Sequence, residues 1–420
     1  MATGRLRAGV AEVEITGKIG LELAGEFAPR VSQGVRSPLL AKALVLANGE
    51  ETLAVGTLDL YGLPGETAGN IARSVAERWG LKPEGVMLIS SHTRGAPYTT
   101  PVVGWPGVHE EYLAEIAPKI IQVVGLAKDA LQDASLGVGH ATLPHLAFNH
   151  RLLTRNMKAV TAWLGVPKNE VLAPEGPIDP QFSVFVVRDG RGFPLCLLWN
   201  FAADNRFAQD GLYSADLPYF VQREVDARLG RHVPCLYLAG CGGNVSFTYG
   251  LEETADAVAS AVMAVQLETS CDPALRLGCA QERVILPIRD YSQFWSKADI
   301  ELKYPQALDA YAQEVALLQQ EGALAVPTTV QAFRLGRFAL VGLPGVPFVE
   351  FALEIKEKSP FLATVVAGNA NDHPGYIITR RAFATEGFEA WPARSAKVGP
   401  GGGEFLAEEV VRLLKELWRA

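Results

Sequence analysis

The feature that most constrains the fold is a series of apolar runs, each typical of a β-strand and each ending in a polar segment. Six runs share this form, and their polar ends lie at residues 57–62, 87–97, 196–206, 235–246, 339–345 and 363–376. In open sheets with alternating strands and helices, ligands bind outside the carboxyl ends of the strands, because loops converge there while the strand bodies stay buried. The six ends therefore predict one shared pocket.

The spacing of apolar residues predicts an α/β fold. We expect strands at residues 7–16, 41–48, 53–60, 85–91, 182–189, 193–201, 233–240, 328–342 and 362–368. We expect helices at residues 65–80, 109–133, 216–229, 251–268 and 403–419, and a helical excursion at 290–320. The Asp189-Gly190 pair between two apolar runs indicates a hairpin. No repeat, linker or shift in composition divides the chain, so residues 1–420 are expected to form one domain.

Composition indicates an ordinary soluble globular protein and argues against nucleic acid as its partner. Of 420 residues, 49% are hydrophobic and 20% are charged, and the net charge is −8 with an isoelectric point near 5.5. Nucleic-acid binding needs a surplus of lysine and arginine on one face, so this charge argues against it. Five cysteines form no disulfide framework and favour a reducing compartment. No apolar stretch approaches the roughly 18 residues of a membrane helix, so we expect a cytoplasmic protein without membrane insertion.

Several segments, taken in order, resemble the catalytic domain of the neutral, non-lysosomal ceramidase family. These enzymes are zinc-dependent amidases that cleave the amide of N-acyl sphingoid bases. The matching segments are residues 8–16, 35–47, 58–62, 89–97, 147–151, 200–206, 213–220, 240–246, 343–350, 375–383 and 387–391. The resemblance implies a mixed β-sheet core with flanking helices. It also implies that the immunoglobulin-like C-terminal domain of the family has no counterpart in this chain.

The metal ligands of the family match this chain only in part. The first zinc histidine falls on His92 and the tyrosine ligand falls on Tyr376. The second histidine falls on Asp204, and a carboxylate oxygen can still bind zinc. The glutamate ligand falls on Val346, which has no donor atom. The resemblance therefore implies zinc as the cofactor in a remodelled site, where the ion would activate water and polarise a carbonyl group.

Further residues are predicted from the resemblance to act on the substrate. The serine that the family places near the scissile carbonyl falls on Ser246, after a Gly-Gly pair whose backbone N–H groups suit a substrate oxygen. Asp372 and His373 are candidates for replacement ligands or a general base, although their sequence is also typical of a turn. In segment 147–151, Asn149 and Arg151 match the family better than His150. The predicted catalytic residues are Ser246, Asn244, Arg94 and His373, and the predicted substrate-binding residues are Arg206, Asn149, Arg151 and Gly243.

Two functions of different class follow from these residues. The first is an intracellular hydrolase of an amide or related carbonyl bond, acting on a small molecule other than ceramide. The second is a metal-free binding protein or non-hydrolytic enzyme in which Arg94 and Arg206 hold an anionic small molecule, because guanidinium groups suit carboxylates and phosphates. A paralogue that has lost its activity and retains only an interaction role is a third reading that the sequence leaves open.

Overall fold

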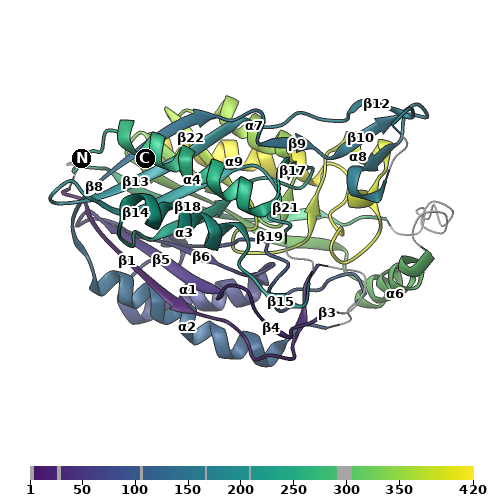
Figure 1. The fold of residues 1–420 in the computed structure, drawn as a ribbon, viewed down its shortest axis with the longest axis horizontal. Helices are drawn as coiled ribbons and strands as arrows, with labels where there is room; N and C mark the ends of the chain where they lie inside the picture. Colours follow the sequence, from purple (N-terminus) through teal and green to yellow (C-terminus); the bar gives the residue numbers. More distant parts are fainter. Residues whose placement is uncertain (1–3, 26–29, 105–106, 166–167, 208–209, 291–304) are drawn as a thin grey trace.

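Two β-sheets form the centre of the molecule. The computed structural model describes residues 4–25, 30–104, 107–165, 168–207, 210–290 and 305–420 (Figure 1). The larger sheet has eight strands in the order β16 (Cys235–Ala239), β14 (Pro194–Phe201), β13 (Gln181–Asp189), β8 (Gln132–Thr142), β1 (Arg7–Glu14), β5 (Leu40–Ala47), β6 (Thr52–Leu58) and β7 (Val86–Ser90). The smaller sheet has four strands in the order β18 (Leu277–Pro287), β19 (Ala325–Leu335), β20 (Phe338–Gly342) and β22 (Ala363–Ala367).

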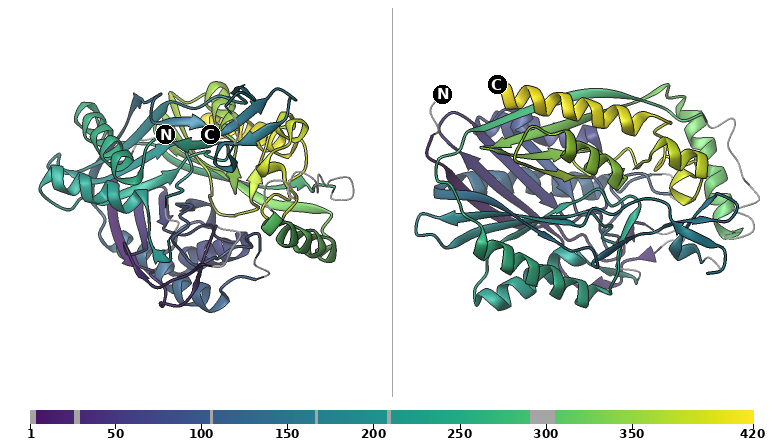
Figure 2. Two further views of the ribbon diagram at one scale, coloured as in Figure 1. Left: turned by 45° about the vertical axis from the view of Figure 1, so that its right-hand side comes forward. Right: turned by 90° about the horizontal axis from the view of Figure 1, so that it is seen from above.

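Helices cover the outer faces of the two sheets (Figure 2). The helices are α1 (Gly65–Trp79), α2 (Glu110–Asp129), α3 (Leu217–Leu229), α4 (Leu251–Glu268), α6 (Pro305–Glu321), α7 (Val349–Lys358), α8 (Arg380–Thr385) and α9 (Gly402–Arg419). Short strands complete the loops: β2 (Glu22–Leu23), β3 (Arg30–Val31), β4 (Gly34–Val35), β9 (Ala147–Asn149), β10 (Arg151–Thr154), β11 (Ala159–Thr161), β12 (Val171–Pro174), β15 (Leu212–Tyr213), β17 (Val245–Phe247), β21 (Val346–Pro347) and β23 (Tyr376–Ile377). Single 3-10 turns lie at η1 (Pro83–Gly85), η2 (Ala162–Leu164) and η3 (Phe388–Ala390).

The alternation of side chains along the strands explains this layered arrangement. In β5, Leu44 and Leu46 belong to the core that includes Leu340 of β20 in the other sheet. Ala43 and Val45 point the opposite way, into a core with α1 and α2. Successive residues of a strand face opposite sides, so one strand can serve two cores. The layers are thus helix, sheet, sheet and helix, with buried leucines that each contribute roughly 1.5–3 kcal/mol.

The expected fold class is confirmed as a mixed α/β fold. β6, α1 and β7 form the predicted strand–helix–strand unit with parallel strands, and β13 and β14 form the predicted antiparallel pair. The predicted helix at 109–133 ends earlier, at Asp129, because β8 begins at Gln132 and pairs with β13. β18 and α7 were not predicted. Of the excursion at 290–320, α6 is a helix, and residues 291–304 lie outside the described residues.

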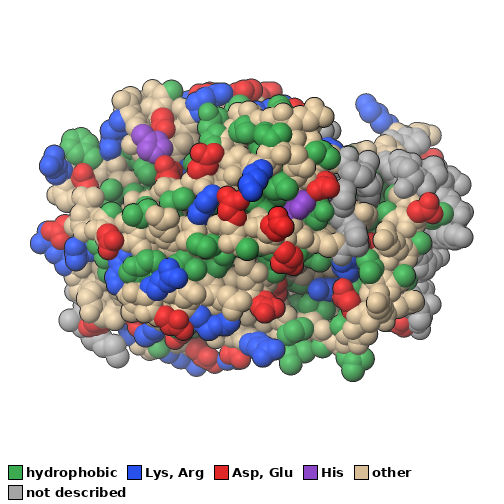
Figure 3. Space-filling view, turned by 90° about the horizontal axis from the view of Figure 1, so that it is seen from below, with side chains coloured by type: hydrophobic (Ala, Val, Ile, Leu, Met, Phe, Trp, Pro, Cys, Tyr) green, Lys and Arg blue, Asp and Glu red, His purple; other side chains and the backbone are tan. Residues whose placement is uncertain are grey.

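The surface in view carries both signs of charge. On the face shown in Figure 3, lysine and arginine side chains are interspersed with aspartate and glutamate. That face has no basic patch of the kind that nucleic-acid binding requires. Among the residues that the structure describes, no helix has the length and apolar character needed to cross a membrane.

Candidate active site

The polar ends of the strands meet as predicted. A cavity of about 20 Å³, large enough for about one water molecule, lies where they converge. Its walls are Ser91, His92, Ala203, Asp204, Asn205, Tyr237, Ala239, Gly240, Gly242, Gly345, Val346 and Asn369. All of these residues except Val346, which directly follows the end at 339–345, come from five of the six ends. The sixth contributes Tyr61, whose ring packs on that of His92 with the ring centres 4.3 Å apart.

His92 is held in a backbone conformation that is uncommon for residues other than glycine. It follows β7 with a φ of 60°, and its backbone N–H donates to the carbonyl of Leu60. Its ring Nδ1 donates to the Tyr61 carbonyl over 2.8 Å, so Nε2 carries the lone pair when the ring is neutral. Burial lowers the His92 pKa, against the opposing charge of Asp204. Strained residues of this kind cluster at functional sites.

His92 and Asp204 present two buried acceptor atoms to the same place. Nε2 of His92 lies 3.8 Å from Oδ1 of Asp204, and neither atom has a hydrogen-bond partner among the described residues. The side chains are only 7% and 6% exposed. A buried polar atom without a partner costs about 1–3 kcal/mol. An arrangement that leaves two such atoms side by side is suited to receive a polar ligand between them.

The donor set does not fit a resident zinc ion. Val346 offers no donor, and the described residues contain no group of three or more His, Cys, Asp or Glu side chains placed to hold a metal. Tyr376 pairs with Val346 through the backbone, and burial raises the pKa of its phenol, with Asp204 acting in the same direction. The Arg94 guanidinium already lies 3.4 Å from Oδ2 of Asp204. Zinc sites in proteins have three or four good ligands, which is more than this arrangement offers.

The two residues considered as replacement ligands take different positions. Asp372 accepts hydrogen bonds from the backbone of Gly65, at the start of α1, and from the Thr328 hydroxyl. A carboxylate is favourable at that helix end. His373 stacks on His92 with ring centres 5.6 Å apart, and its Nδ1 lies 2.6 Å from the side-chain oxygen of Asn369. Burial, with His92 nearby, holds the His373 pKa well below its usual value. Its catalytic role stays a prediction.

Ser246 belongs to a second polar group at the same edge of the sheet. β17 pairs with β9, which brings His150 beside Ser246. Nδ1 of His150 lies 2.8 Å from the Ser246 hydroxyl, and Nε2 lies 3.2 Å from a carboxylate oxygen of Glu389. The backbone of Asp204 bridges to Ser246, and its N–H donates to the carbonyl of Val245. The Ser246 and His92 groups are therefore neighbours.

Arg151 lies behind this second group. Its guanidinium is fully buried and binds the carboxylates of both Glu175 and Glu389, the hydroxyl of Thr385 and the carbonyl of Glu386. Burial acts to raise the Glu389 pKa, but the Arg151 charge and the His150 hydrogen bond outweigh it, and the pKa falls to about 2. Arg151 therefore fixes Glu389 in place. Its predicted contact with a substrate stays a prediction.

Three other predicted residues make bonds within the protein. The Asn149 amide donates to the carbonyl of Pro177, and the Gly243 N–H donates to the carbonyl of Pro347. The Asn244 side chain donates to Glu350 over 2.8 Å and accepts from the backbone of Val349 at the start of α7. These bonds shape the wall of the site. The substrate contacts of Asn149 and Gly243 and the catalytic role of Asn244 remain predictions.

The two predicted anion-binding arginines point to different partners. Arg94 donates to the carbonyl of Gly25 over 2.7 Å as well as approaching Asp204. The Arg206 guanidinium lies over the ring of Trp163 at 4.4 Å, and that ring packs edge-on against His150. The cation–π contact holds Arg206 near the Ser246 group. Anion binding by the two arginines stays a prediction.

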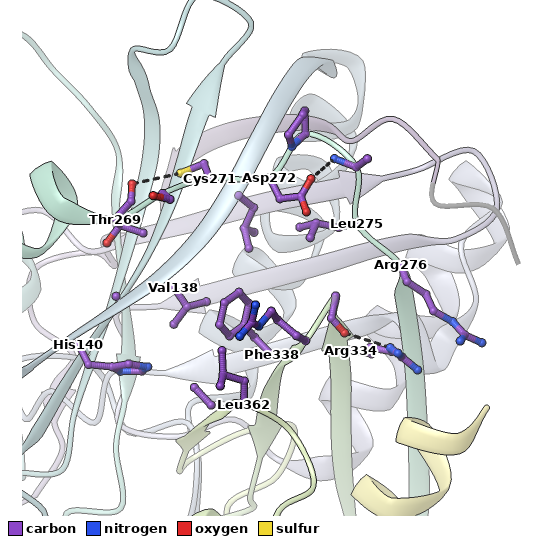
Figure 4. A pocket seen from close by; sticks show the side chains of 18 of the residues that line it. Val138, His140, Thr269, Cys271, Asp272, Leu275, Arg276, Arg334, Phe338 and Leu362 are labelled. Atoms are coloured by element: carbon purple, nitrogen blue, oxygen red, sulfur yellow. Dashed lines mark hydrogen bonds between the residues drawn. The ribbon is translucent and has the colours of Figure 1, made fainter.

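A much larger cavity lies at the opposite end of the smaller sheet. Its volume is about 1190 Å³, and its walls include Phe338 and Leu362, at the amino ends of β20 and β22 (Figure 4). Figure 4 shows Arg276 and Arg334 along one side and His140 and Thr269 along another. None of the residues predicted to act on a substrate lines it. Size alone therefore does not locate the candidate site.

Comparisons with known proteins support the fold. The protein is similar to a solved neutral ceramidase from Pseudomonas aeruginosa, with a TM-score of 0.77 and 19% sequence identity. It is also similar to a ceramidase complexed with C2, with a TM-score of 0.79 and 17% identity. Each match covers 99% of this chain and 75% of the other. No protein-family model and no curated protein matches the sequence. At these identities, the likeness establishes a ceramidase-like fold and nothing finer.

Glu389 and His150 are the residues of this site that the sequence does not single out. Glu389 is absent from the predicted site residues, and His150 matches the family less well than Asn149 and Arg151. The sequence does carry a signal for Glu389, because it lies between Phe388 and the pair Ala390 and Trp391. An acidic residue in such an apolar stretch is expected to be buried, and a buried carboxylate needs a partner.

Proposed function

We propose that this protein hydrolyses an amide or related carbonyl bond of a small molecule other than ceramide. The observation that carries the proposal is the convergence of His92, Asp204 and Ser246 at one edge of a ceramidase-like fold. Two unpartnered acceptor atoms there face a cavity the size of one water molecule. A water bound by both acceptors, or a donor group of a substrate, would satisfy them.

His92 suits the role of a hydrogen-bond acceptor that holds the reacting water or a donor group of the substrate. Its lowered pKa keeps the ring neutral near pH 7, and the hydrogen bond to Tyr61 leaves the lone pair on Nε2. Positioning of a reacting group matters to the rate, because misplacement by about 1 Å can cost about 100-fold. Asp204 would orient the same water or donor group, and Arg94 would hold the carboxylate in position. Zinc, which the resemblance implies, stays an untested prediction. No step of the proposed hydrolysis requires it.

The proposal also places the protein in the cytoplasm. All five cysteines are free thiols, and three of them, Cys196, Cys235 and Cys241, are buried. Free thiols persist in a reducing compartment. Expression of a tagged chain in cells, followed by fractionation, tests this placement.

The test of function is a screen of p-nitroanilides and p-nitrophenyl esters, with and without chelator, on the wild-type chain, His92→Ala and Asp204→Asn. His140→Ala is the matched control, because His140 lies on β8 beside the distant large cavity. We expect each site variant to lose about 100-fold or more in turnover, and the control to lose none. Site variants that keep their fold and their full turnover would contradict the proposal.

A further inference from the structure

Three side chains form a buried chain that ends at a hydroxyl group. Glu389 is fully buried and His150 is 1% exposed, while Ser246 is partly exposed. Glu389 accepts from Nε2 of His150, and this selects the tautomer whose Nδ1 is free to accept the Ser246 proton over 2.8 Å. A nucleophile, a base within hydrogen-bond reach and a third group that orients the base are the elements of an activated serine.

The surroundings hold this chain rigidly. Arg151 fixes one oxygen of Glu389, and the Thr161 hydroxyl donates to the other over 3.1 Å. The Trp163 ring packs edge-on against His150 with the ring centres 4.5 Å apart. The backbone N–H of His150 donates to the carbonyl of Asn244, two residues before Ser246. Catalytic geometry needs such support, because misplacement by about 1 Å can cost about 100-fold in rate.

We propose that Ser246 is a covalent nucleophile, with His150 as its general base and Glu389 as a positioning residue. This inference rests on the proposed hydrolase function and deepens it. The Ser246 oxygen attacks the carbonyl carbon, and its proton passes to Nδ1 of His150. The C–N or C–O bond then breaks, and His150 returns the proton to the leaving amine or alcohol. Water next attacks the acyl-serine ester, His150 takes a proton from it, and Ser246 leaves with that proton restored.

The role of His92 and Asp204 in this scheme is to bind the reacting water or the leaving group. A backbone bridge joins Asp204 to Ser246, so the His92 and Asp204 side chains lie next to the serine. The two groups of residues can therefore contact the same substrate. The scheme needs no metal and no reactant besides substrate and water. It also accounts for a site that retains the serine while Val346 offers no ligand.

A fluorophosphonate probe tests the inference without knowledge of the substrate, because an activated serine displaces its fluoride. We expect about one label per chain, located on Ser246 by peptide mass spectrometry and absent in Ser246→Ala. His150→Gln should slow labelling by at least about 100-fold. The chain offers a matched control in Ser183, which lies 3.0 Å from Nδ1 of His140 but is fully buried. Ser183→Ala and His140→Gln should label as the wild type does.

A second variant keeps the test decisive if His150→Gln does not fold. In Ser246→Cys, His150 should hold the thiol as a thiolate, which iodoacetamide alkylates at least about tenfold faster than an ordinary thiol. Adding Glu389→Gln should slow that alkylation at least tenfold while the near-ultraviolet circular dichroism stays native. An unchanged alkylation rate in the double variant would remove Glu389 from the scheme.

The outcomes separate this inference from the proposed function. Turnover that survives in Ser246→Ala, with no label on Ser246, would overturn the nucleophile while the hydrolase stands. Labelling of Ser246 that depends on His150, in a chain that turns over no amide or ester, would support the nucleophile and contradict the hydrolase. Equal labelling of wild type and folded His150→Gln would overturn the role of His150.

Discussion

Replacement of Arg151 by methionine tests whether its guanidinium group is part of the framework of the site. The side chain is fully buried, and the carboxylates of Glu175 and Glu389 share its charge. Removal of one partner from a buried ion pair costs about 3–5 kcal/mol, because an uncompensated charge stays inside the protein. Two carboxylates lose the same cation here. We therefore expect the free energy of unfolding to decrease by an amount near the upper end of that range.

Equilibrium urea unfolding, followed by circular dichroism, measures this loss. Urea is uncharged, so it does not screen the ion pairs under test. The control is Arg223→Met, because Arg223 pairs with Glu252 at 2.6 Å while the two side chains are 46% and 66% exposed. Exposed pairs contribute about 0–1 kcal/mol, so this variant should lose little. Equal losses in both variants, each below about 1 kcal/mol, would refute the framework role of Arg151.

Three other predictions concern pH, backbone conformation and metal binding. Burial raises the Asp59 pKa to about 7 from 3.8, so the unfolded chain releases a proton that the folded chain keeps between those values. The free energy of unfolding should therefore fall by up to about 4 kcal/mol as pH rises from 4 to 7. In Asp59→Asn, urea unfolding should show no such fall. A variant with the same pH dependence as the wild type would contradict the assignment to Asp59. Gly345 has a φ of 62°, and an added Cβ would lie 2.3 Å from the Gly375 carbonyl oxygen, so Gly345→Ala should lose more than about 1 kcal/mol in thermal unfolding. Gly49→Ala, also at positive φ but in open space, should lose less, and the reverse order would be inconsistent with the packing. Val346→Glu should add a third donor beside His92 and Asp204, so this variant should bind zinc, as measured by mass spectrometry, while Val346→Gln should not. Equal zinc content in the two variants would show that the lack of a carboxylate at position 346 does not determine zinc binding.

Much of the fold and the position of the site could be predicted from the sequence. The strand ends carry His92, Asp204 and Asn369 to one cavity because parallel and mixed sheets bring such ends to one edge. β18 could not be predicted, because Gln281, Glu282 and Arg283 interrupt its apolar pattern. Pairing with β19 stabilises β18 through hydrogen bonds and a buried face, although the sequence of β18 alone does not favour a strand.

The contacts that decide the chemistry are tertiary and could not be read from the chain. His150 and Glu389 are 239 residues apart, and the packing of η3 against β10 and β11 brings them together. Arg94 and Asp204 are 110 residues apart in the sequence, and their contact pairs a side chain predicted to bind an anion with a carboxylate of the protein itself. Motif spacing gives residue types near a site, but the pairing of charges depends on which of them are buried together.

The zinc content and the turnover of one sample test the central claim most directly. Protein purified without chelator would be analysed by mass spectrometry for zinc, and its hydrolysis of a substrate from the screen would be measured before and after chelation. The account predicts far less than one zinc per chain and turnover that survives chelation but is lost in Ser246→Ala. Near-stoichiometric zinc that disappears in His92→Ala and Asp204→Ala, together with turnover lost on chelation, would contradict it.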